Sequence, residues 1–273
     1  LAASAEVVLK KTGVDFLCIS EGEHILPKFL DVMEGCAPTP QLDEVPGFAY
    51  LKDGDLFSTG YADPIPKEEM YELTYKDIGD DDQIRHYTAE VTESDPNFGA
   101  SINQSNVGKR AMHFPCLKGC VAKCTFCHRW DKGIRYIPVD ILITRLQHYV
   151  DHYNVGFVRM SDENFGTDRA WLAEFCSEVE KLDIVWAVSG MRVNCVSAEQ
   201  LEQMKKAGCV RCIFGMETGS KKMLKVMNKG VKLEDNYKAL DLMAQFNLST
   251  TVQLVLGMPG ETNATVKETA AFV

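Results

Sequence analysis

Short apolar segments alternate with longer amphipathic segments from residue 106 to the C-terminal end of the chain. The apolar segments have strand length, and the amphipathic segments repeat their apolar positions every three to four residues, as helices do. This alternation is typical of a parallel βα barrel in an α/β protein. We expect strands at 111–114, 156–160, 184–188, 210–215 and 250–256. We expect helices at 139–149, 168–182, 198–207, 220–228 and 234–246, and a last helix capped by Asn263.

The first 105 residues have a different pattern. Residues 1–62 mix helical and strand-like segments, and their Lys-Asp-Gly-Asp turn predicts a β-hairpin over 48–59. The following stretch contains three prolines and an acidic run at 80–82, and it has few sustained apolar patterns. We therefore predict three regions, which are a partial α/β domain at 1–62, an acidic linker at 63–105 and a barrel at 106–273.

The net charge of the chain and its distribution limit the partners that the protein can bind. The chain has 273 residues and a net charge of −10, with 7 basic and 21 acidic side chains in residues 1–105. Residues 106–273 hold the remaining 22 basic and 18 acidic side chains. Because nucleic-acid binding needs a basic surface, we expect no nucleic-acid partner. No apolar run reaches the roughly twenty residues of a membrane span, and residues 1–20 do not resemble a signal peptide. Both ends fall inside periodic segments, so we expect the chain to be a fragment.

Four of the ten cysteines lie within residues 116–127. Cys120, Cys124 and Cys127 form a C-x3-C-x2-C triplet, and closely spaced thiolates bind soft metals and iron–sulfur clusters. Two other interpretations are open. The spacing also matches one face of a helix, where the thiols would be buried, and a zinc site could recruit Cys116 as a fourth ligand. Since the cysteines do not form a disulfide framework, we expect a reducing cytoplasm.

The triplet, with Phe126 before its third cysteine, resembles the cluster loop of radical S-adenosylmethionine (SAM) enzymes. The segment Gly215-Met-Glu-Thr-Gly-Ser and the turn Gly257-Met-Pro-Gly-Glu are also similar to segments of that family. The resemblance implies that Cys120, Cys124 and Cys127 hold a 4Fe–4S cluster whose fourth iron binds SAM. It also implies that Glu217 accepts hydrogen bonds from the SAM ribose and that Phe126 lies against the adenine.

Other strand ends supply further candidates. Arg192 follows the third predicted strand and could pair with the SAM carboxylate, the alternative being a structural salt bridge. Asp162 and Glu163 end the second strand, where they could contact SAM or substrate or could serve as helix N-terminal charge. His148 and His152 have zinc-like spacing on one helix, but an exposed helix face explains them better.

The resemblance extends to the N-terminal region. Residues 1–62 are similar to the back half of the cobalamin-binding domain found in many radical SAM proteins. The Asp-x-His-x-x-Gly signature that supplies the cobalt ligand is absent from this sequence. The implied fold is therefore a partial, Rossmann-like half of a cobalamin-binding-type domain, followed by about five of the six βα units of a radical SAM barrel. Cobalamin is a possible cofactor.

The resemblance therefore implies a radical SAM enzyme. It would cleave SAM to a 5′-deoxyadenosyl radical for methyl transfer, cyclisation or rearrangement of a small-molecule substrate, with electrons from a flavodoxin- or ferredoxin-like donor. One alternative is a methylthiotransferase-like radical SAM enzyme, which would carry more cysteines than the Cys18 and Cys36 of the N-terminal region. Another is a zinc-stabilised α/β protein that only binds.

Overall fold

The computed structural model describes residues 4–36, 41–71, 86–128 and 133–273. The chain folds as two compact units. The smaller unit comprises residues 1–69 with 128–132, and the larger comprises residues 70–127 with 133–273. None of the helices in the described ranges is long and apolar enough to cross a bilayer.

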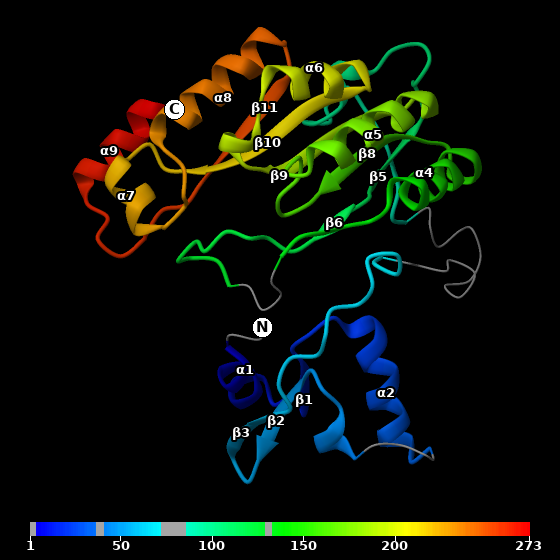
Figure 1. Ribbon diagram of the computed structural model, residues 1–273, viewed down its shortest axis with the longest axis vertical. Helices are drawn as coiled ribbons and strands as arrows, with labels where there is room; N and C mark the ends of the chain where they lie inside the picture. The colour runs from blue at the N-terminus through cyan, green and yellow to red at the C-terminus, as the bar shows by residue number, and fades with distance from the viewer. Residues whose placement is uncertain (1–3, 37–40, 72–85, 129–132) are drawn as a thin grey trace. The chain divides into compact units, whose positions relative to one another are not determined.

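The smaller unit is a three-stranded antiparallel sheet with two helices (Figure 1). Its elements are α1 (Ala5–Thr12), β1 (Phe16–Cys18), α2 (Gly22–Glu34), β2 (Phe48–Lys52) and β3 (Asp55–Ser58). The predicted hairpin is present as β2 and β3, and both Asp53 and Gly54 adopt positive φ, as a tight hairpin turn requires. Leu9 of α1 packs with Leu17 and Ala49 to form the core of this unit.

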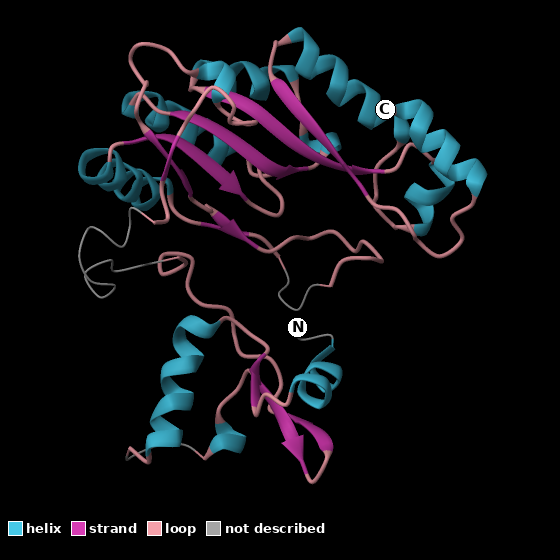
Figure 2. Cartoon of the chain, turned by 180° about the vertical axis from the view of Figure 1, so that it is seen from behind, coloured by secondary structure: helices cyan, strands magenta, loops and turns pink. Residues whose placement is uncertain are grey.

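The larger unit contains a six-stranded sheet in the order β11-β10-β9-β8-β5-β4. Every pairing within it is parallel except that of β4 with β5, and the sheet curls as a half-barrel (Figures 1 and 2). The strands are β4 (Ala89–Glu90), β5 (Arg110–His113), β8 (Val155–Ser161), β9 (Val185–Met191), β10 (Cys209–Glu217) and β11 (Ser249–Leu254). A separate antiparallel ribbon pairs β6 (Leu117–Lys118) with β7 (Arg135–Tyr136). All five predicted barrel strands are confirmed.

Helices follow the strands and line one face of the sheet (Figure 1). They are α4 (Val139–Tyr153), α5 (Arg169–Val179), α6 (Ala198–Lys206), α7 (Lys221–Val226), α8 (Leu233–Gln245) and α9 (Asn263–Phe272). Side-chain caps set several starts, because Asp168 and Ser197 accept hydrogen bonds from the first turns of α5 and α6. The cap of α9 is Thr262 rather than the expected Asn263, because Thr262 forms a reciprocal capping box with Thr265.

Aromatic side chains fill the space between the sheet and its helices. Trp186 of β9 is fully buried and lies against Phe165 and Phe175, with ring centroids 6.0 and 5.4 Å away. Its indole N–H donates to the carbonyl of Ala207, 2.7 Å away, so burial leaves no unmet donor there. Strand β9 is thereby fixed between its neighbours.

Residues 86–105 pack onto the larger unit. Phe98 is fully buried against Phe157 of β8, and Val91 joins the same apolar cluster. Strand β4 falls within the region expected to be a linker, and part of that linker, 72–85, lies outside the described residues. The domain boundaries at 62 and 105 stay a prediction.

Candidate functional site

The candidate residues lie where the parallel strands end. The loop bearing the three cysteines follows β5, and Asp162 with Glu163 follows β8. Arg192 follows β9, and Glu217 is the last residue of β10. In open α/β sheets the carboxyl ends of parallel strands are where ligands bind, because the loops converge there.

One arm of the cysteine loop is held by the two carboxylates at the end of β8. The backbone N–H groups of Cys116 and Leu117 donate to Asp162 Oδ1 at 2.9 and 3.0 Å, and the Cys116 thiol donates to Oδ2 at 3.0 Å. The N–H of Gly119 donates to Glu163 Oε2 at 3.2 Å. The two acids therefore hold the backbone that leads into the cysteine triplet.

Burial controls the protonation of this network. Loss of hydration raises the pKa of Asp162 to about 6, against the opposing effect of the hydrogen bonds that it accepts. Burial, followed by the nearby Asp162 charge, raises the pKa of Cys116 well above its usual value. The Cys116 thiol is fully buried and donates its hydrogen bond to Asp162 Oδ2, so its sulfur is engaged and shielded from solvent. This arrangement counts against Cys116 as a fourth metal ligand.

The other arm of the loop is held by the segment that ends α7. The N–H of Thr125 donates to the carbonyl of Met227 at 2.9 Å, and its hydroxyl donates to the carbonyl of Val226 at 3.0 Å. The side-chain amide of Asn228 donates to the carbonyl of Lys123 at 2.9 Å. Residues 226–229, called the clamp segment below, therefore fix the second arm of the loop as Asp162 fixes the first.

The three predicted ligands share this loop but differ in exposure. Cys120 is buried, Cys124 is half-buried and Cys127 is exposed. Phe126, next to Cys127, is 38% exposed, so its side chain is accessible to a ligand. The loop is not a helix over these residues, which excludes the buried helical stripe. Within the described part of the chain, no three His, Cys, Asp or Glu side chains are gathered as a metal site.

The donor set nevertheless fits a cluster with three protein ligands. Three thiols lie within eight residues of one loop, and the fourth nearby thiol, Cys116, is withdrawn into its bond with Asp162. Thiolates are the ligands of iron–sulfur clusters, and a loop that is anchored at both arms can present them together. His148 and His152 lie on α4, where His152 Nδ1 contacts the His148 carbonyl at 2.9 Å, and they show no third ligand among the described residues.

Glu217 takes part in a buried ion pair. Its Oε1 lies 2.5 Å from Lys229 Nζ, and the two side chains are only 9% and 10% exposed. Glu217 also has a positive φ of 65°, which an L-residue adopts only at a cost. Arg192 donates from Nη2 to the backbone carbonyl of Lys229, also at 2.5 Å. The two polar residues predicted to contact SAM are thus both joined to Lys229.

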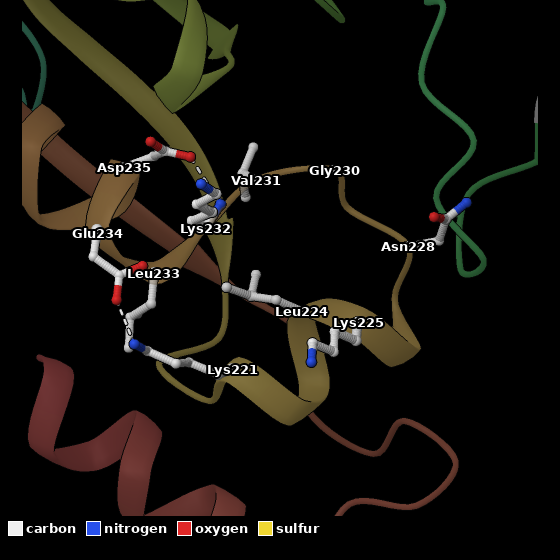
Figure 3. Close-up of a pocket in the computed structure, with 10 residues that line it drawn as sticks. All are labelled: Lys221, Leu224, Lys225, Asn228, Gly230, Val231, Lys232, Leu233, Glu234 and Asp235. Atoms are coloured by element: carbon white, nitrogen blue, oxygen red, sulfur yellow. Dashed lines mark hydrogen bonds and ion pairs between the residues drawn. The ribbon is translucent and has the colours of Figure 1, made fainter.

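A cavity of about 520 Å³ lies between α7 and the start of α8 (Figure 3). Charged side chains of both signs line it. Lys221 forms an ion pair with Glu234, and Asp235 accepts a hydrogen bond from the backbone N–H of Lys232. The residues that line this cavity include none of the predicted site residues, although Asn228 connects it to the cysteine loop.

The fold and the arrangement at its strand ends define a class: an α/β half-barrel protein with a cysteine loop and a carboxylate at its ligand-binding edge. The family model described as "Radical SAM superfamily" matches residues 114–273, more than half of the chain. The chain belongs to the radical SAM superfamily. Proteins of this superfamily use a 4Fe–4S cluster and SAM, so the predicted fold class and these two cofactors are confirmed.

Relatives and solved structures agree with this assignment. The anaerobic magnesium-protoporphyrin IX monomethyl ester cyclase of Cereibacter sphaeroides is 24% identical, over 97% of this chain and 41% of the cyclase. The enzyme of the same name from Rubrivivax gelatinosus is 27% identical, over 97% of this chain and 45% of its own length. The cobalamin-dependent SAM radical enzyme OxsB, solved with aqua-cobalamin, gives a TM-score of 0.71 at 21% identity, covering 99% of this chain and 37% of OxsB. The methyltransferase TsrM of Kitasatospora setae gives 0.68 at 15% identity, covering 99% and 51%.

This chain therefore spans less than half the length of the cyclases that it matches. A putative methylthiotransferase of Methanocaldococcus jannaschii is also similar, at 25% identity over 98% of this chain and 54% of its own length. The similar proteins thus include cyclases, methyltransferases and methylthiotransferases.

Sequence reasoning missed two features of the site. Lys229 was not predicted. The available signal was its place in the Met-Asn-Lys-Gly turn after α7, where Asn and Gly end the helix, so that Lys229 does not lie on a helix face. The bond between Asp162 and Cys116 was also missed, because the two residues are 46 positions apart. An apolar sequence context around Cys116 was the available signal of its burial.

Proposed function

We propose that this chain forms the cluster- and SAM-binding core of a radical SAM enzyme. Cys120, Cys124 and Cys127 would hold the 4Fe–4S cluster, and Glu217 and Arg192 would bind SAM. When bound and reduced by one electron, the cluster supplies the electron that cleaves SAM into methionine and a 5′-deoxyadenosyl radical, which abstracts hydrogen from a substrate.

One observation supports this proposal above the others: the thiol of Cys116 is fully buried and hydrogen-bonded to Asp162. Three of the four clustered cysteines are then left as ligands. Since a cubane cluster has four irons, three protein ligands leave one iron for SAM. A closed structural zinc site needs all four.

The side chains of the strand ends have separate tasks. The Glu217 carboxylate would accept hydrogen bonds from the ribose hydroxyls, and such charge-assisted hydrogen bonds are of the stronger kind. The Arg192 guanidinium would pair with the SAM carboxylate, and the partly exposed ring of Phe126 would lie against the adenine. Asp162 and Glu163 would keep the loop in place and would not take part in bond breaking.

We further propose a small-molecule substrate, a flavodoxin- or ferredoxin-like electron donor and a reducing cytoplasm. Support comes from the relatives, since the names of the cyclases refer to a small molecule. The three regions 1–62, 63–105 and 106–273 are proposed as the domain organisation. Cobalamin is proposed as a second cofactor of the whole protein, supported by the likeness to OxsB and TsrM, whose structures hold it.

The test is anaerobic reconstitution with iron and sulfide. Iron, sulfide and zinc would be measured, and electron paramagnetic resonance (EPR) spectra of the reduced protein would be recorded with and without SAM. We expect about four irons per chain and a spectrum that changes when SAM is added. Cys124→Ala should lose the cluster, and Cys116→Ala should retain it.

Cys36→Ala is the matched control, because it removes an exposed thiol outside the loop. Circular dichroism of each variant would establish that the chain is folded before its iron content is compared. Stoichiometric zinc that depends on Cys116 would overturn the proposal in favour of a structural metal site. A four-iron cluster whose EPR spectrum does not change when SAM is added would also overturn the proposal, in favour of an electron-transfer protein.

A further inference from the structure

The clamp segment contacts the cysteine loop and also both polar residues predicted to bind SAM. The carbonyls of Val226 and Met227 accept hydrogen bonds from Thr125 in the loop. One residue further on, Asn228 reaches the carbonyl of Lys123. The next residue, Lys229, carries the Glu217 ion pair on its side chain and the Arg192 hydrogen bond on its carbonyl.

The backbone of the clamp segment explains how Lys229 comes to point inward. Helix α7 ends at Val226, and Asn228 then adopts a left-handed conformation with φ of 47°. Asn and Gly are the residues that accept this conformation most readily, and Gly230 follows with φ of 69°. Two left-handed positions around Lys229 turn the chain back, so that a lysine just beyond the end of α7 is only 8% exposed.

The ion pair between Glu217 and Lys229 occupies space that a glycine leaves open. A Cβ atom at Gly215 would lie 2.5 Å from Glu217 Oε1 and 3.2 Å from Lys229 Nζ. The bare backbone of β10 at this position therefore makes room for both charged groups. Their burial also makes the pair costly to break, because removal of one partner leaves the other charged and desolvated.

We propose that Lys229 is a positioning residue for SAM. Its ammonium group pairs with Oε1 of Glu217 and so fixes the direction of the carboxylate, which leaves Oε2 to accept from the SAM ribose. Its carbonyl holds the Arg192 guanidinium at the same edge. Lys229 thus acts on SAM through Glu217 and Arg192 and does not contact the reacting atoms. This inference rests on the proposed function.

The test measures SAM binding to the reconstituted chain by equilibrium dialysis, with Lys229→Met, Glu217→Gln and the double variant. Methionine nearly keeps the length of the lysine side chain and removes its charge. We expect each single variant to raise the dissociation constant of SAM about tenfold or more, the usual effect of losing a hydrogen bond to a charged group. The double variant should bind SAM no more weakly than Glu217→Gln alone.

Two further arms keep the test specific. Lys225→Met is the matched control, because Lys225 is an exposed lysine on α7 one turn earlier, and it should bind SAM as the parent does. SAM that lacks its 2′-hydroxyl should show a smaller difference between the parent and Lys229→Met than SAM itself. The EPR spectrum of the reduced cluster should be the same in all variants without SAM.

Other outcomes separate this inference from the proposed function. If Glu217→Gln weakens binding and Lys229→Met does not, the positioning role is overturned and the proposed function stands. A double variant that binds much more weakly than Glu217→Gln would mean that Lys229 contacts SAM itself, which also overturns it. If Lys229→Met does not fold, Lys229→Gln is measured in its place, because its side chain keeps a hydrogen-bond donor for Glu217 and loses the charge. Unchanged SAM binding by that variant would overturn the positioning role.

Discussion

Asp162 provides a quantitative test of how the cysteine loop is held. Its pKa is raised from the usual 3.8 to about 6, chiefly by burial. Between these two values the unfolded chain is ionised at this position and the folded chain is protonated, so the folded state binds one more proton. The contribution of Asp162 to the free energy of unfolding is therefore fully present below about pH 3.8 and is lost as the pH rises through about 6. At about 1.4 kcal/mol for each pH unit, the loss over this interval is about 3 kcal/mol.

The perturbation is Asp162→Asn, which keeps an oxygen for the N–H groups of Cys116 and Leu117 and removes the titration. The free energy of unfolding would be measured by urea titration with tryptophan fluorescence on the metal-free, reduced chain, at intervals between about pH 4 and 7. We expect the difference in this free energy between variant and parent to shift by about 3 kcal/mol in favour of the variant as the pH rises across this range.

Glu163→Gln is the control, because it removes the neighbouring carboxylate, which holds the same loop but accepts from Gly119 instead. The reasoning would be refuted if the difference in the free energy of unfolding between Asp162→Asn and the parent changed by less than about 1 kcal/mol across this pH range. It would mean that water reaches the carboxylate and that burial does not govern its ionisation.

Two glycine substitutions test the close contacts of the site. Gly190→Ala should lower the free energy of unfolding by about 3 kcal/mol or more, because φ is 77° there and the new Cβ would overlap the Asp162 carbonyl; an unchanged urea midpoint would contradict this. Gly215→Ala should displace the Glu217 ion pair and weaken SAM binding about tenfold. Gly22→Ala, whose Cβ meets no atom within 4 Å, should leave SAM binding unchanged, and equal binding by both variants would refute the contact.

The barrel strands and helices were predictable because their hydrophobic periods are local. Strand β10 is apolar over 210–215 except at Arg211, and its neighbours are similarly rich in apolar residues, so each could be recognised alone. Strand β4 could not, since it has two residues, both exposed, and exists because it pairs with β5. The start of α9 was misplaced by one residue because Thr262 and Asn263 are both good caps, and the partner Thr265 decides between them.

The candidate site was only partly predictable for a related reason. Glu217 could be found because it follows an apolar strand within a recognisable segment, and the triplet could be found because its spacing is local. Lys229 acquires its position from two left-handed residues and from the space over Gly215, and neither is visible as a pattern of apolar positions. Partners brought together by the fold, rather than by spacing, are what the sequence conceals.

The environment, rather than the residue type, separates the cysteines of this chain. Burial raises the pKa of Cys176 to about 12, and it raises the pKa of Cys209 well above its usual value, so both remain neutral thiols in the core. Cys116 is only four residues from Cys120, yet its bond to Asp162 assigns it to the same neutral group. Because an irregular loop has few hydrogen bonds of its own, the anchors from β8 and from the clamp segment must fix its course. The three-ligand set that we propose would therefore depend on the half-barrel as much as on the C-x3-C-x2-C spacing.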